Sequence, residues 1–224
     1  HWNKGDLDTA LDYYARSLAI QEKLGDKQGM VYSLNNIGIV HYDKGDYDKA
    51  LNYLSRSLAI FEELGDKSGQ IYTIISIGLM HNYKGDYDKA LGILIPVLKQ
   101  AEDLGDKMAM GYILNNIGLV HFNKGDYEKA LDYYDRTLAI KEKIGDKRGI
   151  GTILNNIGVL HRSKGDYDHA LDYYGRSLSI KEELGYKIEV ENQLWNIALV
   201  HVDIGDYDKA IMYHLKALNR YEER

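Results

Sequence analysis

The chain has 224 residues, no cysteine, one proline and a formal net charge of −6, so disulfide frameworks and thiolate metal sites are excluded. Its 28 Lys and Arg residues are interspersed among 34 Asp and Glu residues and form no basic block, which argues against a nucleic-acid-binding protein. No apolar run is long enough to span a bilayer, and the first residues show no signal peptide, so we expect a cytoplasmic protein that binds no membrane.

Along the chain, a Gly-Asp dipeptide recurs every 40 residues. A second motif, Leu/Ile-Gly-Asp-Lys, recurs with the same period and in fixed phase with the first, and its last copy reads Leu-Gly-Tyr-Lys. Two motifs in register over the whole chain indicate a repeat architecture in which each period is one supersecondary unit. The Gly-Asp dipeptides begin at Gly5, Gly45, Gly85, Gly125, Gly165 and Gly205, and the second motif begins at Leu24, Leu64, Leu104, Ile144 and Leu184.

Each period predicts two α-helices. In residues 32–43, apolar or small side chains recur at i, i+3, i+4 and i+7, which is one face of a helix that we call helix A. Gly45 then supplies the left-handed conformation that ends helix A, and Asp46 is a favourable N-cap for the next helix, helix B. Helix B ends at Leu64, and Asp66 can cap the following helix A. Strand patterns are missing, so the predicted fold class is all-α.

The helix register divides the chain into a partial repeat, four complete helix pairs and a last pair. The chain begins inside a helix A and ends directly after a helix B, without the polar capping helix that a solenoid needs at its ends. We therefore expect a fragment of a longer array. The predicted boundaries are 1–27 for a single helix B, 28–67, 68–107, 108–147 and 148–187 for the complete repeats, and 188–224 for the last helix pair.

The repeat resembles the tetratricopeptide repeat. Residues 45–58, Gly-Asp-Tyr-Asp-Lys-Ala-Leu-Asn-Tyr-Leu-Ser-Arg-Ser-Leu, follow the second helix of that family. Gly38 matches the small residue where its two helices approach, and Ala50 matches the small residue opposite. The long period is similar to that of kinesin light chains, the Pins/LGN polarity adaptors and bacterial signalling proteins. The resemblance implies a right-handed α-solenoid of antiparallel helix pairs, with a concave groove formed by the A helices.

The face of helix A opposite its packed stripe would line this groove, so we predict that peptide-binding residues lie there. Asn recurs at two adjacent groove positions, and its side chain offers a donor and an acceptor to the backbone of an extended peptide. Tyr and Trp beside the amides are residue types that dominate binding energy at interfaces. The predicted groove residues are Tyr32, Asn35, Asn36, Tyr72, Ile75, Tyr112, Asn115, Asn116, Phe122, Asn155, Asn156, Arg162, Trp195 and Asn196.

The same residues leave other interpretations open. The Asn side chains can simply solvate an exposed helix face, or they can bond between neighbouring repeats. Ile75 and Trp195, which replace Asn, indicate either apolar patches for hydrophobic anchors of a partner or drift between repeats. Pro96 lies inside a predicted helix, where it removes one hydrogen bond and should kink the helix. With Ile95 it marks a second contact site, a bend or tolerated drift.

Histidine recurs on the packed stripe of helix A. Stacked helices lie about 8–10 Å apart, too far for these imidazoles to share one zinc ion at about 2.0 Å, so we interpret them as core residues with one ring nitrogen hydrogen-bonded. His169 and His214 stand singly, and we predict no metal site and no cofactor. No P-loop, G-x-S-x-G or H-E-x-x-H motif occurs, so we do not expect an enzyme. The recurring histidines are His41, His81, His121, His161 and His201.

The sequence therefore predicts a protein- or peptide-binding scaffold or adaptor, whose groove holds an extended or helical segment of a partner. Two other functions stay open. The chain can be a structural segment that self-associates through its uncapped ends. It can also be the regulatory arm of a larger signalling enzyme whose catalytic part lies outside these residues.

Overall fold

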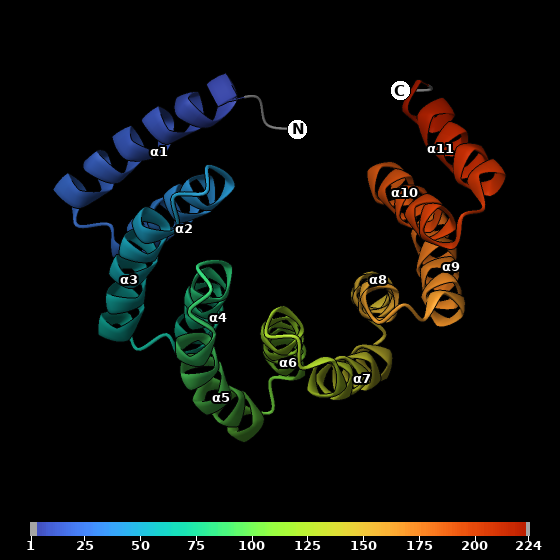
Figure 1. The fold of residues 1–224 in the computed structure, drawn as a ribbon. Helices are drawn as coiled ribbons and strands as arrows, with labels where there is room; N and C mark the ends of the chain where they lie inside the picture. Colours follow the sequence, from blue (N-terminus) through green and yellow to red (C-terminus); the bar gives the residue numbers. More distant parts are fainter. Residues whose placement is uncertain (1–3, 223–224) are drawn as a thin grey trace. The chain divides into compact units, whose positions relative to one another are not determined.

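The computed structural model describes residues 4–222, and every regular element in that range is an α-helix (Figure 1). This confirms the all-α prediction. None of the helices in that range is both long and apolar enough to cross a bilayer. The helices are α1 (Lys4–Leu24), α2 (Lys27–Asp43), α3 (Tyr47–Leu64), α4 (Lys67–Tyr83), α5 (Tyr87–Leu104), α6 (Lys107–Asn123), α7 (Tyr127–Ile144), α8 (Lys147–Ser163), α9 (Tyr167–Glu183), α10 (Lys187–Ile204) and α11 (Tyr207–Glu222).

A glycine with a positive φ angle stands in each turn between the described helices, and these φ angles range from +66° to +86°. At Gly45, where φ is +76°, the chain turns back so that the Asp46 N–H donates to the His41 carbonyl at 2.8 Å. This bond satisfies a carbonyl of the last helical turn, and a residue with a Cβ atom would be strained at Gly45. The prediction that Gly45 ends helix A is confirmed.

The Asp residues that follow the turn glycines differ in their hydrogen-bond partners. Before α4, the Asp66 carboxylate accepts the Gly69 N–H at 2.9 Å, so the cap predicted there is confirmed. Asp46 is the N-cap residue of α3, but its side chain makes no capping hydrogen bond. Its carboxylate instead lies 3.1 Å from Lys49 Nζ and 3.6 Å from His41 Nδ1.

The helices group into two compact units, which divide within α6. Unit 1 ends at Val120 and unit 2 begins at His121. Within unit 1, α2 and α4 lie along one side and α3 and α5 along the other (Figure 1). Within unit 2, α8 and α10 lie along one side and α7 and α9 along the other (Figure 1). The even-numbered helices are thus the A helices, and we call their exposed side the A-helix face of each unit.

Each unit packs a B helix against the A helix of the following pair. In unit 1, Leu54 of α3 packs with Ile77 and Met80 of α4. In unit 2, Tyr174 of α9 packs with Ile197 of α10. Because each helix pair buries its apolar stripe only against its neighbours, each unit has the packing of a helical-repeat solenoid.

Glycine lets the two helices of a pair approach closely. A Cβ atom added to Gly38 of α2 would lie 3.2 Å from Leu54 Cγ, and one added to Gly158 of α8 would lie 2.6 Å from Tyr174 Cδ1. Ala50, the predicted small residue opposite, is fully buried. The prediction that Gly38 marks the close approach of helices A and B is confirmed.

Pro96 lies inside α5, which runs from Tyr87 to Leu104. Its ring is exposed, and so is half of the Ile95 side chain. The helix tolerates the missing N–H of Pro96, since the rest of α5 packs through its buried stripe.

Candidate functional site

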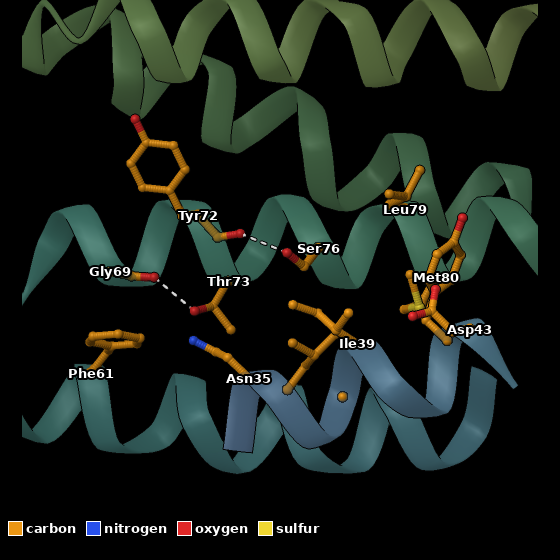
Figure 2. Close-up of a pocket in the computed structure, with 13 residues that line it drawn as sticks. Asn35, Ile39, Asp43, Phe61, Gly69, Tyr72, Thr73, Ser76, Leu79 and Met80 are labelled. Carbon is orange, nitrogen blue, oxygen red and sulfur yellow. Dashed lines mark hydrogen bonds between the residues drawn. The ribbon is translucent and has the colours of Figure 1, made fainter. Parts of the chain in front are cut away.

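The A-helix face of unit 1 contains a pocket between α2 and α4 (Figure 2). Its volume is about 540 Å³, within the range of about 300–1,000 Å³ that is typical of ligand pockets. Asn35 and Ile39 of α2 face Thr73 and Ser76 of α4 (Figure 2). The residues that line it are Asn35, Gly38, Ile39, Tyr42, Asp43, Leu54, Phe61, Gly69, Tyr72, Thr73, Ser76, Leu79 and Met80.

The Thr73 and Ser76 hydroxyl groups of the pocket are bonded within their own helix. Thr73 Oγ1 donates to the Gly69 carbonyl at 2.8 Å, and Ser76 Oγ donates to the Tyr72 carbonyl at 3.1 Å (Figure 2). These hydroxyl protons are therefore used by the backbone of α4. What the pocket presents to a ligand is mainly the carbon surface of its Ile, Leu, Met and aromatic side chains.

Asn35 is a polar residue of the lining whose amide oxygen is not used. Its Oδ1 atom is buried, and no donor within residues 4–222 hydrogen-bonds to it. A buried acceptor without a donor costs about 1–3 kcal/mol of stability. Rotation about the last side-chain torsion, which is soft in Asn, would turn this carboxamide toward the pocket. Asn35 thus offers an unused amide beside an apolar cavity.

Leu54 distinguishes the pocket from the equivalent place in unit 2. Leu54 and Gly38 pack together, and both line the pocket. At the same repeat positions of unit 2, Tyr174 packs against Gly158 and is 1% exposed. Burial raises the pKa of Tyr174 to about 12, so its phenol is neutral at physiological pH. The phenol ring of Tyr174 occupies side-chain space that the shorter Leu54 leaves open.

The tyrosines of the first predicted groove position are exposed on the A helices of unit 1, and Tyr72 lines the pocket. Tyr32 is 64% exposed, Tyr72 is 38% exposed and Tyr112 is 45% exposed. The rings of Tyr72 and Tyr112 meet edge to face, with their centroids 6.2 Å apart. Ile39, which lines the pocket, is 55% exposed. This part of unit 1 therefore presents large apolar side chains to solvent.

Two predicted groove residues of unit 1 are not available to a partner. Ile75 is 7% exposed, so its prediction as an apolar anchor is wrong, because the side chain belongs to the core of unit 1. Asn116 is 8% exposed, and its Nδ2 atom donates to the Tyr112 carbonyl at 2.9 Å. Asn36 and Asn115 are half-buried.

In unit 2, polar groove residues bond to one another. Asn196 Nδ2 donates to Asn155 Oδ1 at 2.9 Å, which is the bond between neighbouring repeats that the sequence left open as an alternative. Arg162 Nε donates to Asp203 Oδ2 at 2.6 Å, and this bond raises the pKa of Arg162. Half-buried Asn156 completes the amides of this face.

The aromatic groove residues of unit 2 also have neighbours within the unit. The Phe122 ring lies 5.7 Å from that of Tyr127, and the Trp195 ring lies 4.3 Å from that of His214. Trp195 nevertheless keeps 53% of its surface exposed. Of these predicted residues, Trp195 offers the larger free surface.

Four of the recurring histidines are buried as predicted, and His81 is partly exposed. The predicted hydrogen bond to a ring nitrogen forms at His81 and His161, but the Nδ1 atoms of the other three have no hydrogen-bond partner within residues 4–222. His41 is buried, its ring stacks on Tyr53 with centroids 5.5 Å apart, and its Nδ1 atom lies 3.6 Å from Asp46 Oδ2. Burial lowers the pKa of His41, and the ammonium of Lys49 lowers it further. The same stacking on a Tyr of the next helix recurs at His121, His161 and His201.

Of the thirteen residues that line the pocket, only Asn35 and Tyr72 were among the predicted site residues. The residues that were missed include three that lie on packed helix faces. Leu54 lies on a B helix, and Thr73 and Met80 lie on the packed side of α4. The available indication was that residue 54 is Leu where the repeats of unit 2 carry Tyr134 and Tyr174. A shorter side chain at a buried position of a repeat indicates that a cavity can form there.

Family models of one kind match most of the chain. A model described as tetratricopeptide repeat matches residues 1–63 and 109–183, and a second model of the same description matches residues 194–224. A model of anaphase-promoting complex subunit 5 matches residues 38–124. No curated protein sequence matches the chain.

Several solved structures have a similar fold. BtubC (BKLC) from P. vanneervenii has a TM-score of 0.78 at 21% identity, over 97% of this chain and 91% of that chain. NprR in complex with its cognate peptide NprX has a TM-score of 0.69 at 18% identity, over 97% and 68% of the two chains. A kinesin light chain from Podosopora anserina with nearly identical TPR-like repeats has a TM-score of 0.67 at 12% identity, over 86% and 95%. At these identities the likeness concerns the fold.

Proposed function

This chain belongs to the tetratricopeptide repeat family, and on that premise we propose that it is a protein-binding scaffold whose unit 1 holds a peptide segment of a partner on its A-helix face. The observation that carries the proposal is the apolar pocket between α2 and α4, with the unpartnered Oδ1 of Asn35 beside it. The ligand is a segment that inserts one large apolar side chain into the pocket.

The chemistry of the pocket selects such a segment. Full burial of a Leu, Ile, Phe or Met side chain contributes about 1.5–3 kcal/mol, and the lining offers little else to a ligand. The carboxamide of Asn35 can accept a backbone N–H or donate to a backbone carbonyl of the bound segment. The exposed rings of Tyr72 and Tyr112 would cover its flanking residues.

The relatives are consistent with this use of the fold. NprR, which has a similar fold, has been solved in complex with its cognate peptide. That peptide binding is a property of NprR, and at 18% sequence identity the two proteins are similar in fold only. For this chain, the proposal of peptide binding rests on the pocket of unit 1.

Selection from a random peptide library displayed on phage tests the proposal, followed by calorimetry of the selected peptides. We expect these peptides to share a large apolar residue, and Ile39→Glu to weaken their binding at least tenfold because it places a charge at the pocket. Ile95→Glu is the matched control, since Ile95 is 50% exposed and Ile39 is 55% exposed. This control should leave Kd within twofold. Equal affinity of the two variants, or no selected peptide, would contradict the proposal.

A further inference from the structure

One turn of the repeat differs chemically from the others. In most repeats, a Lys stands three residues after the Asp that pairs with the recurring His, as Lys49 does after Asp46. Its ammonium contacts that carboxylate, with Nζ 3.1 Å from the oxygen at Asp46 and 2.8 Å at Asp126. Between α8 and α9, this position is His169. A second imidazole therefore replaces a fixed positive charge.

The three side chains of this turn converge. His161 Nδ1 lies 2.9 Å from Asp166 Oδ2, and His169 Nδ1 lies 2.8 Å from Asp166 Oδ1. The two imidazole rings lie 5.2 Å apart, so the prediction that His169 stands singly is wrong. One possible ligand atom from each residue lies within 4.8 Å of the other two.

This spacing is close to that of the ligands of one metal ion. Imidazole nitrogen and carboxylate oxygen bind zinc at about 2.0–2.2 Å, and tetrahedral ligands at that distance are about 3.4 Å apart. Small side-chain rotations would bring the three atoms to it. The side chain of His169 is 65% exposed and that of Asp166 is 37% exposed, so an ion can enter from solvent and keep water as a further ligand.

The surrounding charge favours a cation. The carboxylates of Asp168 and Asp172, together with that of Asp166, interact electrostatically with His169.

A further carboxylate faces the cluster from the neighbouring helix. Asp135 of α7 interacts electrostatically with His161. Carboxylates of α7 and α9 thus lie around the two imidazoles. A divalent cation there would meet a negative field, whereas four other repeats present an ammonium at the same place, from Lys49, Lys89, Lys129 and Lys209.

We propose that His161, Asp166 and His169 form a binding site for one zinc-class divalent metal ion. The ligand set is two neutral imidazoles and one carboxylate, which suits zinc and its transition-metal neighbours better than magnesium or calcium. The ion would join the end of α8 to the start of α9. The site is separate from the pocket of unit 1 and does not depend on the proposed peptide binding.

Calorimetric titration of the whole chain with zinc chloride tests this site. We expect one zinc ion per chain, and at least a tenfold weaker affinity in His169→Lys. This variant should fold normally, because it restores the residue that Lys129 and Lys209 supply in other repeats, where Nζ lies 2.8 Å and 2.9 Å from the carboxylate. Zinc should also shift the imidazole NMR signals of His161 and His169.

His81→Asn provides the matched control. His81 Nδ1 lies 3.3 Å from Asp86 Oδ2 but has Lys89, and not a second imidazole, at the third position. Removal of the His81 imidazole should leave the zinc affinity within twofold of the wild-type value. The proposal is overturned if the wild-type chain binds no zinc, if His169→Lys binds zinc as the wild type does, or if His81→Asn removes the binding.

Discussion

The A-helix faces of units 1 and 2 use the same repeat position in different ways. Asn35 of unit 1 and Asn155 of unit 2 lie 120 residues apart, which is three periods. Asn155 Oδ1 accepts from Asn196 at 2.9 Å. In unit 1, the residue in place of Asn196 is Ser76, whose hydroxyl donates to its own helix, and Asn35 Oδ1 is left without a donor. Whether the Oδ1 atom of the Asn at this repeat position accepts a hydrogen bond therefore depends on which side chain the next repeat places beside it.

The same contrast extends to the ends of the A helices. Arg162 and Asp203 form an ion pair in unit 2. At the equivalent positions of unit 1, the rings of Tyr42 and Tyr83 lie 5.1 Å apart. Unit 2 therefore satisfies its exposed face with polar contacts of its own, and unit 1 keeps an apolar and aromatic surface. Exchanging equivalent residues between the units tests whether these side chains cause the difference.

The largest effect should come from exchanging Tyr174 of unit 2 for Leu, which is the residue at the equivalent position 54 beside the pocket of unit 1. Tyr174→Leu should lower the free energy of unfolding of unit 2 by about 2 kcal/mol, because it removes a ring that is 1% exposed and leaves a cavity. Hydrogen exchange of the α9 and α10 amides would measure this loss. Unchanged protection would mean that the neighbouring helices collapse into the space.

Leu54→Tyr makes the reverse exchange in unit 1. Its ring should be accepted against Gly38, as the Tyr174 ring is accepted against Gly158, and should fill part of the pocket. We expect peptides selected by the wild-type chain to bind at least tenfold more weakly, with little change in thermal stability. Retained affinity would show that the part of the pocket near Leu54 does not contribute to binding.

A smaller effect should follow from exchanging the amide partners. Asn196→Ser removes the donor to Asn155 Oδ1 and should destabilise unit 2 by about 1 kcal/mol. Ser76→Asn should supply Asn35 with a donor and stabilise unit 1 by a similar amount, while weakening peptide binding. Urea denaturation of both variants measures the change in the free energy of unfolding, which should be negative for Asn196→Ser and positive for Ser76→Asn. Changes of the same sign would contradict the idea that the side chain of the next repeat determines whether the Asn is hydrogen-bonded.

The sequence was sufficient for the fold because its evidence is local. Gly45 and its counterparts require a left-handed backbone, and the apolar stripe of residues 32–43 requires a helix face, whatever the neighbours are. Each element can therefore be predicted within one period. The close approach at Gly38 is equally local, since both helices of the pair lie within one repeat.

The site could be predicted only in part, because it depends on differences between repeats. The exposed aromatic residues Tyr32 and Tyr72 follow from the helix period. The buried state of Ile75 does not, since it depends on how α4 packs in unit 1. Whether the Oδ1 atoms of Asn35 and Asn155 accept a hydrogen bond depends on residues 41 positions further along the chain. The pocket depends on the length of the Leu54 side chain.

The smallest effect concerns the contrast between the ionic and the aromatic pair. A double-mutant cycle with Arg162→Met and Asp203→Asn should give a coupling energy of about 0.2–1 kcal/mol, because both side chains are about one-third exposed. This coupling should decrease in 1 M NaCl, where the screening length falls from about 10 Å at 0.1 M to about 3 Å. The cycle is measured by urea denaturation at both salt concentrations.

The control cycle uses Tyr42→Leu and Tyr83→Leu in unit 1. Aromatic pairs contribute about 0.5–1.5 kcal/mol through contact and ring quadrupoles, which salt does not screen at this distance. We therefore expect its coupling to be the same at both salt concentrations. A loss of both couplings in salt would mean that salt acts on the unfolded chain. A loss confined to Arg162 and Asp203 would show that the two units close the ends of their A-helix faces by different physical interactions.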